Sequence, residues 1–290
     1  MLEEFGARSG VLPPQMAVFE HLGETDAESG LLLPFAFEET LCRDVGESLI
    51  QPSVHLWSHP AGLVLGLRDS RLPYAGRAME RLEQRGIRTA VRHSGGAAVP
   101  LDAGVVNVSL LLPRPRGSLD FHDDFRLLAS LITEAVACSH PGAAAEVRAG
   151  EVQGSYCPGD YDLAIGGRKF CGIAQRRQAK AYFVHAFVVV EGQGTVRGEL
   201  ARSFYEEAVG DAQGCDYPVV RPETMGALGE MGGPGEAAVF SDGILQALRN
   251  RGVMLRNAGQ VEAETGYTLD YADNRVQEAE RQLRARYARG

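Results

Sequence analysis

The sequence lacks an excess of basic residues, and this argues against several kinds of partner. Its 290 residues include 29 Lys and Arg against 38 Asp and Glu, which gives a formal net charge of −9. A protein that binds nucleic acid or an anionic membrane through a broad surface is usually basic. We therefore expect that neither nucleic acid nor a membrane is a partner of this chain.

Long apolar runs and paired cysteines are also missing. The longest apolar stretch, residues 181–190, is about ten residues long and too short to span a bilayer. The N-terminus, MLEEFGARSG, has no basic region followed by an apolar one, so we expect a cytoplasmic protein. The cysteines are odd in number and form no CxxC pair, which predicts neither a disulfide framework nor a metal site. These cysteines are Cys42, Cys138, Cys157, Cys171 and Cys215.

The residues that are present suit one large α+β domain. Hydrophobic residues make up 44% of the sequence, enough for a substantial core. Apolar segments of strand length cluster around isolated helices and do not alternate strictly with them, which favours a mixed, largely antiparallel sheet flanked by helices. We expect an N-terminal extension at residues 1–33, a catalytic domain at 34–250 and a C-terminal helical extension at 251–290.

Hydrophobic periodicity predicts the individual elements. Helices are expected at residues 35–50, 73–86, 120–139, 197–209, 222–230, 237–251 and 272–288. Strands are expected at residues 54–57, 63–67, 87–92, 98–101, 105–112, 161–165, 169–175 and 182–191. The last two strands flank a basic connection, which indicates a hairpin.

A glycine-rich segment, RHSGGAAVPLD, stands between two of the expected strands. Its adjacent glycines, Gly95 and Gly96, allow the backbone to approach a ligand closely and to direct N–H groups at an anion or a carbonyl. Taken alone, the same pattern also fits an ordinary hairpin turn.

Two further segments contain side chains that suit acyl chemistry. Cys157 lies in GSYCPGDYDL, an expected loop, although a buried cysteine with a structural role is an alternative. Lys169 lies in GGRKFCGIAQRR, where it begins a strand after a Gly-Gly turn, and a solvated lysine is the alternative there.

Together these segments resemble the biotin/lipoate protein ligase catalytic family over residues 34–250. RHSGGAAVPLD is similar to the family's Arg-Arg-x-Ser-Gly-Gly-Gly-Ala-Val-x-His-Asp element, and GGRKFCGIAQRR is similar to its Gly-Lys-Lys-x-x-Gly-x-Ala-Gln-Arg-Arg element. The chain departs from the family pattern at His93, Ala97 and Leu101. The resemblance implies a fold like that of biotin synthetases and class II aminoacyl-tRNA synthetases.

Within that family, SYCPGDYDL and RPETMGALGE resemble the branch of amidotransferases. The branch implies transfer of an octanoyl or lipoyl group, through a cysteine thioester, in protein lipoylation. The implied donor is the octanoylated glycine-cleavage H protein, and the implied acceptors are lipoyl domains of 2-oxoacid dehydrogenase complexes. No cofactor is expected. The resemblance implies Cys157 and Lys169 as catalytic residues and Arg92, Ser94, Gly95, Gly96 and His185 as substrate-binding residues.

The residue chemistry agrees with such a transfer. Moving an acyl group between two lysine amides makes and breaks similar bonds, so the reaction does not require ATP. A cysteine can open the donor amide in two easier steps, and a nearby cation favours its thiolate. Lys169 follows Cys157 by twelve residues and is the expected cation and proton donor for the leaving amine. His185 fits either contact with substrate or a place in the core.

The resemblance also implies that lipoyl domains are acidic around the target lysine, so docking onto this acidic protein requires a local basic patch. The expected patch is Arg176, Arg177 and Lys180, in the hairpin that follows Lys169.

Three other functions remain open from the sequence. The first is an ATP-dependent lipoate or octanoate ligase, which usually has an accessory domain after the catalytic one. The second is octanoyl transfer from acyl carrier protein. The third is a binding module that carries acyl groups without catalysis.

Overall fold

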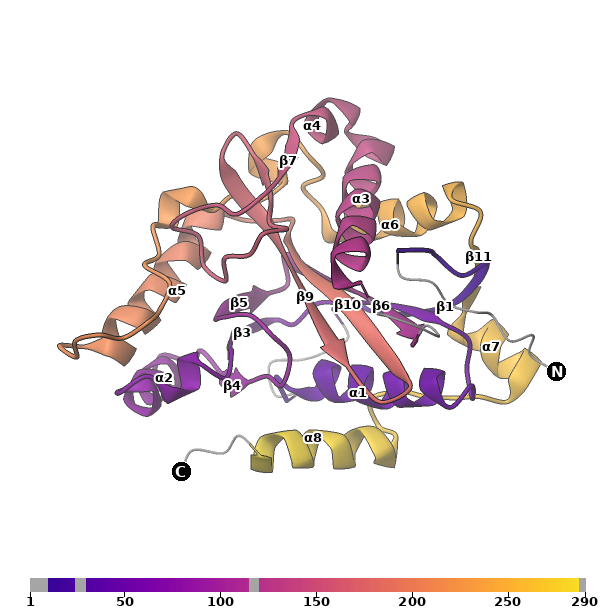
Figure 1. Ribbon diagram of the computed structural model, residues 1–290, viewed down its shortest axis with the longest axis horizontal. Helices are drawn as coiled ribbons and strands as arrows, with labels where there is room; N and C mark the ends of the chain where they lie inside the picture. Colours follow the sequence, from indigo (N-terminus) through magenta and orange to yellow (C-terminus); the bar gives the residue numbers. More distant parts are fainter. Residues whose placement is uncertain (1–9, 24–29, 115–119, 287–290) are drawn as a thin grey trace.

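A sheet of eight strands forms the centre of the protein (Figure 1). The computed structural model describes residues 10–23, 30–114 and 120–286. The strands of this sheet are β1 (Gln15–His21), β2 (Ser53–Trp57), β6 (Val105–Pro113), β7 (Val147–Ala149), β8 (Leu163–Ile165), β9 (Arg168–Arg177), β10 (Ala181–Val189) and β11 (Met254–Asn257). Their order is β11-β1-β2-β6-β10-β9-β8-β7.

A smaller sheet and the helices surround this centre. The smaller sheet has the order β4-β3-β5, with β3 (Ala61–Leu65), β4 (Thr89–Val91) and β5 (Val99–Asp102). The helices are α1 (Leu33–Gly46), α2 (Ala75–Gln84), α3 (Phe121–Ser139), α4 (Pro141–Ala145), α5 (Gly194–Val209), α6 (Ala237–Asn250), α7 (Ala258–Thr265) and α8 (Asn274–Arg286). Three short 3-10 turns complete the described part: η1 (Asp69–Arg71), η2 (Pro222–Thr224) and η3 (Gly229–Met231).

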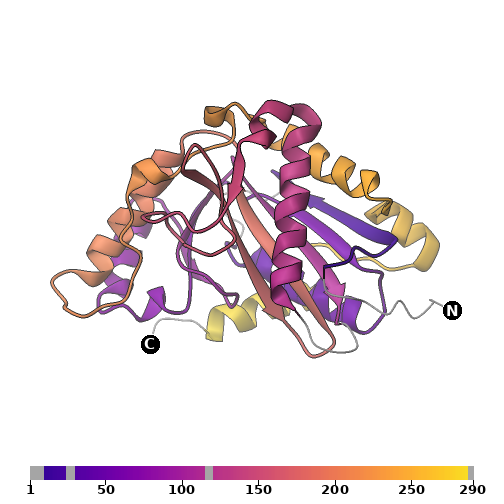
Figure 2. The ribbon, with the colours of Figure 1, turned by 45° about the horizontal axis from the view of Figure 1, so that its top comes forward.

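Helices cover both faces of the large sheet. Helices α3 and α6 lie on one face and α1 lies on the other, with α8 packed on the outer side of α1 (Figures 1 and 2). Successive side chains along β10 point to opposite faces of the sheet, and each face is covered by its own apolar core. Phe183 and Phe187 belong to the core cluster on the α1 side, whereas Tyr182 and Val184 belong to the cluster beneath α3 and α6. A strand whose successive side chains are both apolar is buried on both faces.

The expected fold class is confirmed. Strands β2, β6, β10, β9, β8 and β7 pair antiparallel in turn, while β1 pairs parallel with both β2 and β11. The sheet is therefore mixed and largely antiparallel, and helices flank it.

Both segments expected as extensions contribute strands to the large sheet. Strand β1 lies within residues 1–33 and β11 within residues 251–290, and the two pair side by side in the register Gln15↔Met254. The first and last parts of the chain thus close one edge of the sheet together.

The expected helix at residues 222–230 is wrong. The segment forms the 3-10 turns η2 and η3 with an extended stretch between them. Between these turns its backbone bonds to the sheet: the N–H of Gly226 donates to the Lys169 carbonyl, and the N–H of Leu228 donates to the Val189 carbonyl. The neighbouring strands β9 and β10 therefore satisfy the groups that a helix would have paired internally.

Two loops meet where the sheets adjoin. The first, the glycine loop, joins β4 to β5 and contains Gly95 and Gly96. The second, the cysteine loop, joins β7 to β8 and contains Cys157. Within the described ranges, no helix combines the length and the apolar character that crossing a bilayer requires.

Candidate active site

Cys157 lies where the β7–β8 loop meets the glycine loop. Its backbone has φ +47°, a conformation that is uncommon for residues other than glycine. The side chain is half-buried, and its Sγ accepts a hydrogen bond from the N–H of Ala97 at 3.2 Å. The Nη2 of Arg92 lies 3.8 Å from the same sulfur. The thiol therefore faces a backbone donor and a guanidinium cation.

Arg92 is buried and fixes the glycine loop from within. Its Nη1 donates to the Val64 carbonyl at 3.1 Å, and its Nη2 donates to the Ala97 carbonyl at 2.6 Å. Its Nε and Nη2 also donate to the Gly95 carbonyl at 3.2 and 3.1 Å. These bonds hold the guanidinium in one place beside Cys157.

Lys169, near the start of β9, is fully buried and contacts the main chain of the cysteine loop. Its Nζ donates to the carbonyls of Tyr156 at 2.9 Å and of Cys157 at 2.6 Å. It also forms an ion pair with Oδ1 of Asp162 at 2.9 Å. Burial raises the pKa of Asp162 to about 6, although Lys169 acts in the opposite direction. The expected contact of Lys169 with the thiol is replaced by contacts with its backbone.

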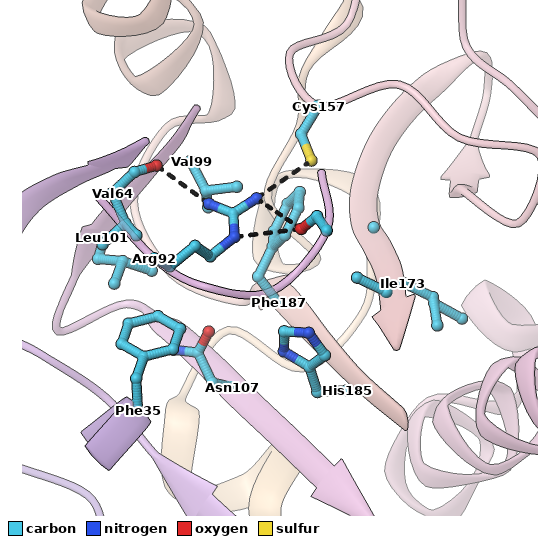
Figure 3. A pocket seen from close by; sticks show the side chains of 13 residues that line it. Phe35, Val64, Arg92, Val99, Leu101, Asn107, Cys157, Ile173, His185 and Phe187 are labelled. Carbon is cyan, nitrogen blue, oxygen red and sulfur yellow. Dashed lines mark hydrogen bonds between the residues drawn. The ribbon is translucent and has the colours of Figure 1, made fainter. Parts of the chain in front are cut away.

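An apolar cavity opens beside Cys157. In Figure 3, Cys157 lies at one end, while Asn107 and His185 lie at the other. Burial lowers the pKa of His185 to about 4, so the imidazole is neutral near pH 7. Its Nε2 has no hydrogen-bond partner among the described residues. The remaining walls are formed by Phe35, Val64, Arg92, Gly95, Val99, Leu101, Gly172, Ile173, Ala174 and Phe187.

A second pocket borders the glycine loop and shares only Gly95 with the first cavity. Its walls are residues 67–69, residues 93–97, Pro158 and residues 216–218. Ser94 is buried there. Ala97, whose N–H donates to Sγ of Cys157 at 3.2 Å, also lines this pocket, so the pocket lies close to the thiol.

A charged network ties the glycine loop to α1 and to the β9–β10 hairpin. Oε2 of Glu39 lies 2.7 Å from Nε2 of His93, and Oε1 of the same carboxylate lies 3.2 Å from Nη2 of Arg176. Hydrogen bonds and the charges of these two partners lower the pKa of Glu39 to about 2 against the effect of burial, so the carboxylate stays ionised. The charge of Arg176 is therefore partly neutralised by a carboxylate within the protein.

The structure brings most of the expected site residues together. Cys157, Arg92 and Gly95 line the first cavity, and His185 lies at its far end. Ser94 and Gly96 line the second pocket instead. Lys169 lies beneath the cysteine loop.

Two participants were not predicted from the sequence. Asp162 pairs with Lys169, and Glu39 pairs with His93. Asp162 falls within the strand expected at residues 161–165, and the observed strand β8 begins one residue after it, at Leu163. No local pattern indicated Glu39, which belongs to a different element. No cluster of metal-ligating side chains occurs among the residues that the structure describes.

Comparison with protein families and curated sequences gives a consistent result. The lipoyl protein ligase A/B catalytic domain matches residues 31–257. An octanoyl-GcvH:protein N-octanoyltransferase of Lysinibacillus sphaericus is 38% identical over 80% of this chain and 80% of its own. The enzyme of the same name from Anoxybacillus flavithermus is 42% identical over 68% of this chain and 70% of its own. A lipoyl-GcvH:protein N-lipoyltransferase of Listeria monocytogenes is 39% identical over the same shares.

Solved structures share the fold at much lower identity. A lipoate-protein ligase A bound with ATP has a TM-score of 0.66 at 16% identity, covering 95% of this chain and 96% of its own. A putative lipoate protein ligase from T. acidophilum has a TM-score of 0.63 at 15% identity, covering 94% and 95%.

Proposed function

This chain belongs to the lipoyl protein ligase A/B catalytic-domain family, and we propose that it is an acyltransferase of protein lipoylation. It moves an octanoyl or lipoyl group from the lysine of glycine-cleavage H protein to lysines of lipoyl domains in 2-oxoacid dehydrogenase complexes. The names of relatives that are about 40% identical over most of the chain support the donor. The observation that carries the chemistry is the Cys157 thiol at the mouth of an apolar cavity.

In the proposed first step, Sγ of Cys157 attacks the carbonyl carbon of the acyl-lysine amide. A sulfur–carbon bond forms, the carbon–nitrogen bond breaks, and the departing amine takes up the proton that the thiol has lost. The exposed backbone at Gly95 and Gly96 lies where N–H groups can face the carbonyl oxygen as it gains charge.

The second step reverses the first with a different amine. The acceptor lysine attacks the thioester, a carbon–nitrogen bond forms, the carbon–sulfur bond breaks, and the thiol regains its proton. The bonds made and broken across both steps are equivalent, so the proposed cycle consumes no ATP.

We place the acyl chain in the apolar cavity. Each methylene group that leaves water contributes about 0.8 kcal/mol, so an eight-carbon chain gains most of its binding from these walls. The neutral state of His185 at the far end is compatible with an uncharged acyl tail.

We place the lysine of the protein substrate in the second pocket. An acyl-lysine amide extends in two directions from its carbonyl. Cys157 lines the first cavity, and Ala97, whose N–H donates to Sγ of Cys157, lines the second. Leu67, Tyr217 and Pro218 are partly exposed there and suit the methylene stem of a lysine.

We also propose a cytoplasmic location, because a reducing compartment keeps a catalytic thiol free.

The proposed function is tested with octanoylated H protein as donor and an apo lipoyl domain as acceptor, without ATP. We expect octanoylation of the acceptor lysine, detected by mass spectrometry, at a rate that added ATP does not change. Efficient acylation from free octanoate plus ATP, with no transfer from H protein, would instead identify a ligase. Transfer only from octanoyl-acyl carrier protein would replace the donor.

A further inference from the structure

The acyl cavity ends on a row of polar side chains that crosses the large sheet. His55 of β2, Ser109 of β6 and His185 of β10 are directly opposite one another in the register of these strands. Directly opposite side chains lie on the same face of a sheet. That face is the one covered by α1, because His185 alternates along β10 with Tyr182 and Val184 of the other face. Figure 3 shows His185 at the end of the cavity away from the thiol.

Glu38 of α1 completes this row from the helix side. Its side chain is fully buried, and its Oε1 accepts hydrogen bonds from Nε1 of Trp57 at 2.8 Å and from Oγ of Ser109 at 2.6 Å. Nδ1 of His55 lies 3.1 Å from the same oxygen. Burial acts to raise the pKa of Glu38, but the hydrogen bond with His55 and the other contacts lower it on balance, so the carboxylate is ionised near pH 7. We refer to Glu38, His55, Ser109 and His185 as the polar layer.

Two buried atoms of the polar layer have no hydrogen-bond partner among the residues that the structure describes. They are Oε2 of Glu38 and Nε2 of His185. The two side chains lie close enough for each to influence the pKa of the other. An apolar chain pressed against this layer offers neither atom a hydrogen bond and keeps water away from both, and a buried polar atom without a partner is costly.

The polar layer interrupts a face that is mainly apolar on either side of it. On the side of the thiol, the preceding row brings Phe187 opposite Gly172, where an added Cβ would lie 2.6 Å from the Phe187 ring, so this glycine leaves the cavity open. Asn107 in that row is polar, but its Nδ2 donates to the Trp57 carbonyl at 3.4 Å. On the far side, the next row brings Leu111 opposite Phe183, and both belong to the core.

We propose that the polar layer sets the maximum length of the acyl chain, and that His185 is the specificity-determining residue that meets the end of the chain. The limit arises because a longer apolar chain leaves polar atoms unpaired, and not because a bulky side chain blocks its way. This inference rests on the proposed function for the place of the acyl chain in the cavity.

The test measures how fast p-nitrophenyl esters of hexanoate, octanoate and decanoate acylate Cys157, with the acylated peptide quantified by mass spectrometry and Cys157→Ala as the blank. In the wild type we expect the octanoyl ester to react at least about tenfold faster than the decanoyl ester. His185→Leu replaces the imidazole by an apolar side chain of similar size, and added methylene groups then gain from burial. The decanoyl ester should then react within about threefold of the octanoyl ester.

His185→Gln is the matched control, because it keeps a polar group at the end of the cavity and should keep the wild-type preference. Both variants should unfold cooperatively near the wild-type temperature, since Nε2 of His185 has no hydrogen bond to lose among the described residues. An equal gain for decanoate in both variants would show that volume sets the limit, and an unchanged preference in His185→Leu would show that the polar layer does not; either result overturns the inference. Absence of transfer from H protein, with these ester preferences retained, would reject the proposed function and leave the length limit standing.

Discussion

At the residue scale, the site depends on how closely the glycine loop approaches Cys157. A Cβ added at Gly96 would lie 2.8 Å from Sγ and 2.7 Å from Nη2 of Arg92. Gly96 also has φ +96°, which side chains rarely tolerate. At Gly95, by contrast, an added Cβ would meet no atom within 4 Å, and its φ is not in the positive range.

Alanine at the two positions should therefore have opposite consequences. We expect Gly96→Ala to reduce transfer at least about a hundredfold, because it displaces the sulfur and strains the loop by about 1–3 kcal/mol. Gly95→Ala is the matched control and should retain transfer within about threefold, with thermal stability near that of the wild type. Equal loss in both variants would show that exposed loop backbone, and not clearance around Sγ, limits the reaction.

Asp162 links the site to pH with opposite signs for stability and activity. Because burial raises its folded-state pKa from 3.8 to about 6, it contributes stability that is present below 3.8 and is lost as the pH rises through 6. Activity has the reverse requirement, since only the ionised carboxylate pairs fully with Lys169.

The test compares the wild type with Asp162→Asn. The unfolding free energy of the wild type, relative to that of the variant, should fall between about pH 4 and pH 7. The rate of transfer by the wild type should rise through pH 6. The variant should lack that rise. Parallel profiles of the two proteins in both measurements would remove Asp162 from the account.

At the element scale, helix α8 stabilises the face of α1 that is turned away from the sheet. Arg275 pairs with Oδ2 of Asp44 at 2.8 Å, and the hydroxyl of Tyr267 donates to the same oxygen at 2.7 Å. The Asp44 side chain is only 6% exposed, so removal of its cation leaves a poorly hydrated charge. Helix α1 also carries Phe35, which lines the acyl cavity.

Arg275→Ala should therefore lower the unfolding free energy by about 1–2 kcal/mol and the midpoint of thermal unfolding by a few degrees. Arg281→Ala on the same helix is the control, because its pair with Glu278 is exposed and should contribute almost nothing. Similar midpoints for both variants would mean that α8 is held by its apolar residues alone.

Local patterns predicted the elements that carry the site, and distant pairing decided the rest. The helix at 35–50 and the strands at 169–175 and 182–191 appear as α1, β9 and β10 because their apolar periodicity is strong and continuous. Strand β11 has only four residues, and it pairs with β1 across more than two hundred residues of chain, so local periodicity does not predict this edge of the sheet. The order of motifs predicted that Cys157, Lys169 and the glycine loop lie together. Which atoms of Lys169 and Arg92 face the sulfur depends on loop conformation, and sequence spacing does not determine it.

At the scale of the whole molecule, a net charge of −9 would repel the acidic lipoyl domains that the proposed function implies as acceptors. Two members of the expected basic patch have internal partners: Arg176 with Glu39 at 3.2 Å, and Lys180 with Glu47 at 2.8 Å. Arg177 extends from the same hairpin in an exposed environment, where its Nε donates to Gln175 at 2.9 Å.

Arg177→Glu should raise the KM for the lipoyl domain severalfold with little change in turnover, and the difference from wild type should diminish at high salt. Arg176→Glu should instead reduce turnover as well, because it breaks the link from the hairpin through Glu39 to the glycine loop. A KM for Arg177→Glu that equals the wild-type value at low salt would exclude this patch from docking.

The central claim is a covalent acyl-enzyme on Cys157, and one measurement tests it most directly. The protein is mixed with octanoylated H protein, without acceptor or ATP, quenched in acid, and analysed by intact mass and peptide mapping. We predict the mass gain of one octanoyl group, located on Cys157, removed by hydroxylamine and transferred to an apo lipoyl domain when one is added. Cys157→Ala should show neither the adduct nor the transfer. Octanoylation of the acceptor by Cys157→Ala at the wild-type rate would contradict the account.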